Sequence, residues 1–257
     1  MSFDHTVNLS YGMEKRNETT ARYALGTRGE LPDGRVFYYA QAGAALGAGH
    51  LCVSRAPVGN HDSDLAVSTA AALGANSIEV TLGATTLGTD EYKDGYIYVN
   101  DVDGEGHMYR ISSHAAADAS TQAVMALADD DVIVEALTTS SQAGLYANPF
   151  KDVVEVALDV DREIAGVAVT EVANAEFCWL QTFGLCAVFI STGTSGHVPI
   201  VGRGLQPMIS TSDITGSVEK TSTALDNAWH GAQHIGVLVN VAAATTETGL
   251  ASLTIRQ

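Results

Sequence analysis

The clearest grouping of chemically active side chains is the acidic run Asp101-Val-Asp-Gly-Glu-Gly106. A calcium-binding loop uses acids at positions 1, 3 and 5, glycine at position 6 and a bidentate glutamate at position 12. This run meets the first four requirements, but Ser112 occupies position 12, and strand-like segments flank it instead of helices. We therefore expect a hairpin turn here, with a weak calcium site as the alternative.

The histidines and serines do not form a catalytic or metal-binding motif. His230 and His234 are four residues apart, which suits a shared metal only on a helix, and His234 begins a predicted strand. Ser195 and His197 are close in sequence, whereas a catalytic serine–histidine pair is assembled in space. The Gly/Ala loop at 43–49 lacks the Lys-Ser/Thr of a phosphate-binding loop. We therefore expect no enzymatic activity, no cofactor and no metal.

The three cysteines are Cys52, Cys178 and Cys186. An odd number of cysteines, in a chain whose first residues lack the apolar core of a secretory signal, favours reduced and buried thiols. A disulfide between Cys178 and Cys186 is the alternative, because both lie in neighbouring apolar segments.

The net charge limits the classes of partner that the protein is expected to bind. The 257 residues include 13 Lys and Arg against 30 Asp and Glu, for a net charge of −17. Nucleic-acid binding depends on clusters of Lys and Arg, so we expect no nucleic-acid partner. No run of about 18 apolar residues occurs, so we expect no membrane span.

The positive charges are concentrated near the start of the chain. Five of the thirteen lie within the first 35 residues, and these are the candidate partner-contact residues: Lys15, Arg16, Arg22, Arg28 and Arg35. We interpret residues 1–34, which show no hydrophobic period, as an extended basic arm that lies on an acidic neighbour. That neighbour is a second protein or another copy of this chain. A solvated tail is the alternative.

Short apolar or alternating segments recur every 8–12 residues after position 34, which predicts an all-β barrel or sandwich. The expected strands are 35–39, 77–83, two within 95–112, 122–127, 131–137, 152–158, 164–170, 175–182, 185–191, 205–210, 234–241 and 250–255. The Ala-rich segment 65–75 is interpreted as a hairpin arm, and 222–232 as a helix of at most three turns.

We expect three regions, because Asn148-Pro149 favours a turn and a boundary. They are the arm at 1–34, a β-rich domain at 35–147 and a small barrel-like domain at 148–257. In the last region, 175–192 should form a hairpin that turns at Gly184 and is buried on both faces against 234–241. Trp179 should then be a core residue.

An ordered set of phrases resembles the head decoration, or capsid cement, proteins of tailed bacteriophages. The phrases are DGRVFYYAQAGAALGAGHLC (33–52), GANSIEVTLGA (74–84), GYIYVNDVDGEGHMYRISSH (95–114), ALTTSSQAGLYANPFKDVV (136–154), CWLQTFGLCAVFI (178–190), PIVGRGLQPMI (199–209) and HIGVLVNV (234–241). The chain differs from the small decoration barrels in its long first half and its N-terminal segment. The resemblance implies attachment to the major capsid protein and homo-oligomers, as dimers or trimers.

We therefore expect a non-enzymatic virion structural protein, assembled in the host cytoplasm, that binds the outside of an icosahedral capsid and stabilises it. The alternative is a receptor- or carbohydrate-binding module of a tail fibre or adhesin. It would use the aromatic residues Tyr38, Tyr39, Tyr92, Tyr96, Tyr98 and Trp179. A third possibility is a β-rich hydrolase whose site is assembled from distant residues.

Overall fold

A computed structural model describes residues 6–157, 162–190, 200–207, 215–220, 233–240 and 247–257. The chain forms two compact units. Unit 1 combines residues 1–55 with 149–257, and unit 2 comprises residues 56–148. The expected all-β class is confirmed, and the only helical element in the described part is a single 3₁₀ turn at Met13–Lys15. The expected domain limits differ, because residues 35–55 pair with late strands and belong to unit 1.

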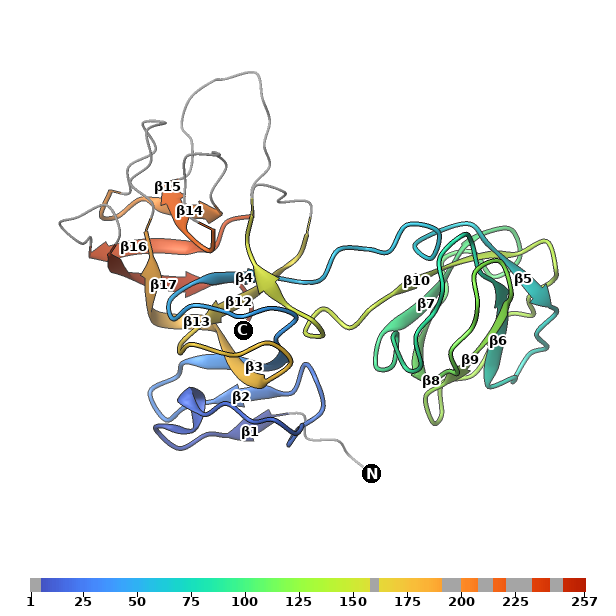
Figure 1. Cartoon of the computed structure of the whole chain (residues 1–257), viewed down its shortest axis with the longest axis horizontal. Coiled ribbons are helices and arrows are strands. Elements are labelled where there is room, and N and C mark those ends of the chain that lie inside the picture. Colours follow the sequence, from blue (N-terminus) through green and yellow to red (C-terminus); the bar gives the residue numbers. More distant parts are fainter. Residues whose placement is uncertain (1–5, 158–161, 191–199, 208–214, 221–232, 241–246) are drawn as a thin grey trace, which may run out of the picture. The chain divides into compact units, whose positions relative to one another are not determined.

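Unit 1 is built on one sheet of eleven strands, drawn in blue and in yellow to red in Figure 1. Its main path runs β1-β2-β3-β13-β17-β16-β14-β15, with β4, β11 and β12 branching from it. The bounds along this path are β1 Thr6–Asn8, β2 Arg28–Glu30, β3 Val36–Gln41, β13 Phe177–Phe189, β17 Thr248–Thr254, β16 Gly236–Asn240, β14 Gly204–Pro207 and β15 Val218–Lys220. The branch strands are β4 Leu51–Val53, β11 Val154–Glu155 and β12 Ile164–Ala168.

Strand β13 holds this sheet together, and it replaces the hairpin expected at 175–192. The chain continues through Gly184 without turning back, so the predicted turn is wrong. Residues 177–183 pair with β3, and residues 183–189 pair with β17. Gly184 has φ +88, and a Cβ there would meet Arg35 Cγ at 3.0 Å. The glycine therefore bends a continuous strand where it exchanges one partner for the other.

The N-terminal segment is part of the sheet, so the expected extended arm is wrong for residues 6–34. Strand β1 pairs in parallel with β2, which pairs antiparallel with β3. Leu9 and Leu31 are buried in one cluster with Phe37, Tyr39 and Trp179. The sequence pattern concealed this burial, because the apolar residues are isolated and the core they enter is supplied by distant strands.

Trp179 is buried as expected, and it depends on the N-terminal segment for its cover. A Cβ on Gly29 would lie 2.7 Å from Leu9 Cδ1 and 2.8 Å from the Trp179 ring, so only a glycine leaves room for both side chains. The Trp179 ring also packs against Tyr39 at a centroid distance of 5.0 Å and Tyr23 at 5.3 Å. These contacts make residues 6–34 a structural part of unit 1.

Unit 2 is inserted between two strands that pair with each other. The chain leaves unit 1 after β4 and returns at β11, and these strands are antiparallel neighbours with Val53 opposite Val154. The two ends of the insertion are therefore held side by side by unit 1. The boundary expected at Asn148-Pro149 agrees with the end of unit 2.

Unit 2 is a closed six-stranded barrel, shown in cyan to yellow-green in Figure 1, with the order β10-β5-β6-β9-β8-β7. The strands are β5 Leu65–Thr69, β6 Ser77–Thr81, β7 Tyr96–Asp101, β8 Met108–Ser113, β9 Gln122–Leu127 and β10 Gln142–Tyr146. Inward residues alternate with outward ones, and the barrel interior is filled by side chains such as Ile78, Ile97 and Met125. The barrel therefore lies in the first half of the chain, not at 148–257 as expected.

The predicted strands have different outcomes in the structure. The hairpin around Asp101–Gly106 is confirmed as β7–β8, and the hairpin arm expected at 65–75 contains β5, which pairs antiparallel with β6. Residues 131–137 form no strand, and only Leu137 makes an isolated bridge, with Ala71. The helix expected at 222–232, the Ser195–His197 pair and His230 lie outside the described residues.

We predict that Leu31→Ala destabilises unit 1 by about 2–5 kcal/mol, because Leu31 is 2 % exposed within the Trp179 cluster. Urea unfolding followed by tryptophan fluorescence measures the loss. Leu73→Ala is the control, since Leu73 is 70 % exposed and should change the free energy of unfolding by less than about 0.5 kcal/mol. A mobile N-terminal arm would instead give Leu31→Ala the stability of the unsubstituted chain.

We also predict that Gly184→Ala lowers the stability of unit 1 by about 1–3 kcal/mol. The positive φ strains any residue with a Cβ, and the added methyl group would press on Arg35. The same substitution at Gly88, which has ordinary φ and whose Cβ would meet nothing closer than 3.6 Å, is the control. Equal unfolding midpoints for the two variants would contradict the bend at Gly184.

Candidate interaction surface

The five candidate contact residues all lie in unit 1, but three of them are paired locally. Arg22 lies 3.5 Å from Glu18, Arg28 lies 2.8 Å from Glu30, and Arg35 lies 2.9 Å from Asp33, measured between nitrogen and carboxylate oxygen. Lys15 and Arg16 are exposed, and neither forms an ion pair with a described residue. The structure therefore places the five in one region without making it strongly basic.

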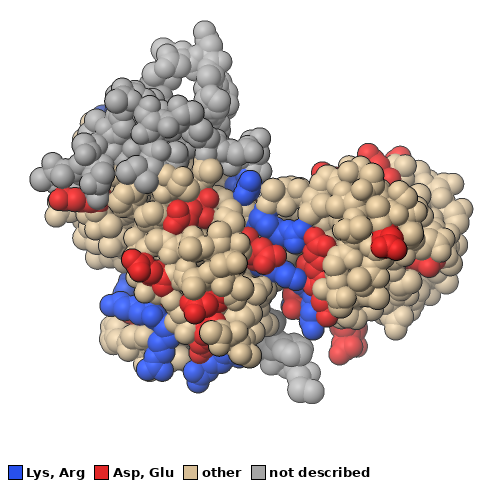
Figure 2. All heavy atoms as spheres, viewed as in Figure 1, with Lys and Arg blue, Asp and Glu red and all other residues tan. Residues whose placement is uncertain are grey.

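Figure 2 shows Lys and Arg spheres gathered at the lower end of the unit drawn on the left, with Asp and Glu spheres among them. Residues 6–35 contain four acids beside the five bases, so this segment carries little net charge within a chain of net charge −17. The sequence already indicates this local pairing of opposite charges, because each paired acid is two or four positions from its arginine. Long-range attraction by this segment is accordingly modest.

A more distinctive surface lies on the outer side of β13, β17 and β16, which we call the outer face. Its apolar members are Leu185, Ala187, Val237, Val239 and Leu250. Leu185 lies opposite Ser252, which lies opposite Val237 on the next strand, so these side chains form one row. Leu250 pairs with Ala187 in the adjacent row.

The same three strands bury their inward residues in the largest core of unit 1, which includes Cys186, Val188, Leu238, Ala251 and Leu253. Strands with apolar residues on both sides are typical of sheets that are covered on both faces. Within the described residues the second face stays open, and Leu185 is 53 % exposed. The expectation that this segment is buried on both faces is therefore wrong within the single chain. Sequence reasoning identified the strand but missed the outer face.

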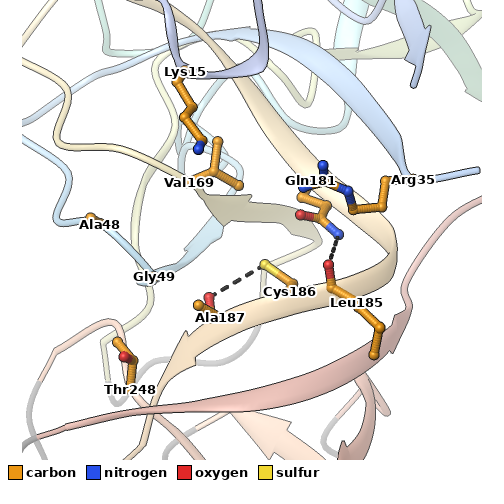
Figure 3. A pocket seen from close by; sticks show the side chains of 10 residues that line it. All are labelled: Lys15, Arg35, Ala48, Gly49, Val169, Gln181, Leu185, Cys186, Ala187 and Thr248. Atoms are coloured by element: carbon orange, nitrogen blue, oxygen red, sulfur yellow. Dashed lines mark hydrogen bonds between the residues drawn. The ribbon is translucent and has the colours of Figure 1, made fainter. Parts of the chain in front are cut away.

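A pocket of about 360 Å³ opens beside the outer face at the bend in β13 (Figure 3). Val169 and Cys186 give the pocket its apolar lining, whereas the Leu185 side chain points away from the pocket toward the outer face and only its carbonyl faces Gln181 (Figure 3). Lys15 and Arg35, two of the five candidate residues, also line it, one from the 3₁₀ turn and one from the start of β3. The pocket thus joins the cationic N-terminal segment to the apolar sheet.

Gln181 sets the polarity of this pocket. Its side-chain nitrogen donates to the carbonyl oxygens of Phe183 at 3.1 Å and Leu185 at 2.8 Å. Because both partners are acceptors, the amide orientation is fixed and its oxygen faces the pocket, as Figure 3 shows. No described residue donates to that oxygen. Gln181 is only 1 % exposed as a residue, and its oxygen keeps access to solvent through the pocket.

A second, acidic pocket of about 540 Å³ lies elsewhere in unit 1, with Glu155, Glu171 and Glu176 along its wall. Burial raises the pKa of Glu155, but hydrogen bonds outweigh that effect and lower the pKa overall. They come from His50, whose Nδ1 lies 2.8 Å from Glu155 Oε1, and from the Gly47 N–H at 2.6 Å. These two hydrogen bonds hold the 43–50 loop against β11, which contains Glu155.

The remaining candidate groups are held in the cores. Burial raises the pKa of Cys178 and Cys186 to about 12, so both thiols keep their protons at neutral pH. All three cysteines are free. Among the six aromatic residues of the carbohydrate-binding alternative, Tyr39, Tyr92 and Trp179 are buried and have no face available for a sugar.

Across the described ranges, no group of three His, Cys, Asp or Glu side chains is arranged to hold a metal ion. Asp103 in the acidic turn instead accepts a hydrogen bond from the Thr138 hydroxyl at 2.9 Å. In that same part of the chain, no helix has the length and apolar character needed to span a membrane. Comparison with known proteins found no matching family model, no matching curated protein and no matching solved structure.

We predict that Glu155→Gln reduces the stability of unit 1 at pH 7 by about 1 kcal/mol, a value that allows for solvent screening of this partly exposed group. The folded-state pKa of Glu155 lies below its ordinary value of 4.5, so the ionised carboxylate stabilises the fold above that pH. That contribution is lost as the pH falls through the folded-state pKa.

Urea unfolding between pH 7 and pH 3 checks this dependence. The difference between the unsubstituted chain and Glu155→Gln should shrink steadily below pH 4.5. Glu105→Gln is the control, because Glu105 is an exposed acid in the 101–106 turn of unit 2. A difference that stays constant down to pH 3 would show that ionised Glu155 does not stabilise the fold.

Proposed function

We propose that the protein is a non-enzymatic virion structural protein that binds the outer surface of an icosahedral bacteriophage capsid and stabilises it. The single observation that carries this proposal is the outer face, an ordered apolar surface with Leu185, Val237 and Leu250 exposed side by side. Apolar surface of this kind marks a site of association with another macromolecule. The phrase-level resemblance to capsid decoration proteins supplies the class of partner.

The outer face suits attachment to a large rigid partner. Its strands are fixed by the core beneath them, so little conformational entropy is lost when the surface is covered. Lys15 and Arg35 lie at its edge, where they can orient an acidic partner surface. We propose the major capsid protein as that partner, and further copies of the chain as neighbours in a dimer or trimer.

The proposed mechanism is adhesion by many identical weak contacts. An icosahedral shell repeats each binding site many times, so a modest interface per copy yields a large total stabilisation. Contacts between adjacent copies would make removal of any one copy slower. Chemistry at a catalytic site plays no part in this mechanism.

We predict that the protein is present in purified virus particles at a fixed ratio to the major capsid protein, in the range of hundreds of copies per particle. Quantitative mass spectrometry of gradient-purified particles measures this ratio. Absence from particles overturns the proposal. A copy number of a few per particle, as for a tail fibre, also overturns it and favours the receptor-binding alternative.

Binding to shells that lack the protein tests the outer face directly. We predict that Leu250→Asp reduces the bound copy number at least tenfold, because it places a charge within the apolar surface. Leu73→Asp, at an exposed leucine of unit 2, is the matched control and should leave binding unchanged. Circular dichroism of both variants confirms that they fold. Equal binding by the two variants would contradict the role of the outer face.

A further inference from the structure

We propose that unit 2 contains a pH-sensitive switch, in which the neutral imidazole of His114 holds Tyr92 in the barrel and protonation of its Nε2 atom releases it. Tyr92 lies in the connection between β6 and β7, and it is 2 % exposed within the barrel core. Its release therefore opens part of that core to water. The switch concerns unit 2 alone and goes beyond the proposed attachment function.

Two histidines from different parts of the chain contact the two hydrogen-bond donors of Tyr92. The Tyr92 backbone N–H donates to Nε2 of His114, the residue that follows β8, at 2.9 Å. The Tyr92 hydroxyl lies 3.0 Å from Nδ1 of His61, which precedes β5. His61 and His114 are 0 % and 6 % exposed. Each contact therefore satisfies a donor in an interior where unpaired donors are costly.

The partners of the other ring nitrogens determine where each proton lies. His114 Nδ1 is 3.1 Å from the Ala115 carbonyl oxygen, which can only accept, so Nδ1 carries the proton and Nε2 is the acceptor. His61 Nε2 is likewise 3.1 Å from the Thr85 carbonyl oxygen. Its proton lies on Nε2, and Nδ1 accepts from the Tyr92 hydroxyl. Both imidazoles are therefore neutral when Tyr92 is held.

A second proton has different effects on the two histidines. A proton on His114 Nε2 faces the Tyr92 backbone N–H, which cannot accept, so that hydrogen bond is lost and two donors oppose each other. A proton on His61 Nδ1 faces a hydroxyl, which can rotate and accept. The switch therefore depends on His114.

The charged groups of the surrounding segments leave this conflict in place. These groups are Asp62, Asp90, Glu91, Lys93, Asp94 and Asp118. Asp94 pairs with Arg110 at 2.8 Å, and Glu91 accepts from the Gly88 N–H at 2.9 Å. Asp90 accepts from the backbone N–H of His114 at 3.1 Å, and not from its ring. None of these contacts supplies another acceptor for the Tyr92 N–H.

The direction of the pH dependence follows from the protons bound in each form. The released form takes up a proton at His114 that the held form excludes, so a falling pH favours release. A solvent-exposed histidine binds its proton near about pH 6.5. Tyr92 should therefore be held at pH 7.5 and released progressively below about pH 6.5. A single proton changes this equilibrium by at most about tenfold per pH unit.

Amide hydrogen exchange of the full-length chain, measured by nuclear magnetic resonance between pH 7.5 and pH 5, tests the switch. After correction for intrinsic exchange, the protection factor of the Tyr92 amide should fall at least about tenfold over this range. His114→Gln supplies an acceptor that does not titrate, so its protection factor should change less than about threefold. His107→Gln is the matched control, because His107 of unit 2 contacts the Gly104 carbonyl and not Tyr92. It should keep the full fall.

The ¹⁵N chemical shifts of the His114 ring test the same point without a substitution. At pH 7.5 they should report a proton on Nδ1 alone, and Nε2 should become protonated over the pH range in which Tyr92 loses protection. These two midpoints decide the matter if His114→Gln leaves Tyr92 unprotected at every pH. Midpoints more than about one pH unit apart would overturn the proposal. So would a proton on Nε2 at pH 7.5, a protection factor that is constant with pH, or a full fall that persists in His114→Gln.

Discussion

Unit 1 depends on the continuity of β13 through the bend at Gly184. The strand contributes Trp179 to the cluster with Leu9 and Leu31, and it contributes Cys186 and Val188 to the core under the outer face. One segment therefore belongs to two cores, and its direction must change between them. The positive φ of the glycine allows that change, and the absence of a Cβ leaves room for the Arg35 side chain. Gln181 then satisfies two carbonyls around the bend, which is why a polar acceptor faces the pocket there.

The insertion of unit 2 leaves this arrangement intact, because its two ends lie on paired strands. Val53 and Val154 are opposite each other in the β4–β11 ladder. Hydrogen bonds between these strands therefore fix the distance between the two ends of the insertion, whatever its length. The closed barrel that fills the insertion has its own core and exposes no sheet edge. Each unit can thus satisfy its own backbone and bury its own apolar side chains. Because unit 2 interrupts unit 1 in the sequence, the order of strands along the chain does not indicate which unit a strand belongs to.

The sequence predicted those elements whose partners are close along the chain. The alternation at 77–81 and 122–127 and the turn residues at 101–106 determine a local hairpin or a strand face, and the structure confirms them. It did not predict the pairing of β3 with β13, whose strands are more than 130 residues apart, because period and turn chemistry carry no information on long-range partners. The N-terminal segment was misinterpreted for this reason, since Leu9 and Leu31 have no periodic apolar neighbours. At the candidate site, Lys15 and Arg35 were predicted from charge. Gln181 and Leu185 could not be predicted, because their roles depend on the bend.

Charged side chains and apolar side chains have different roles on the surface of unit 1. Most of the basic residues near the start of the chain are neutralised by acids two to four positions away, so they contribute little to attraction at a distance. Lys15 differs because it forms no ion pair with a described residue, and it lines the pocket at the bend of β13 together with Arg35. Desolvation strengthens a matched charge contact and penalises an unmatched one. A partner with apolar surface but no carboxylate at this edge would therefore cover Lys15 without a matching charge, whereas Arg35 keeps its ion pair with Asp33. In the proposed attachment to a capsid, the apolar face would supply most of the affinity and the cations beside it would favour a partner with complementary charge.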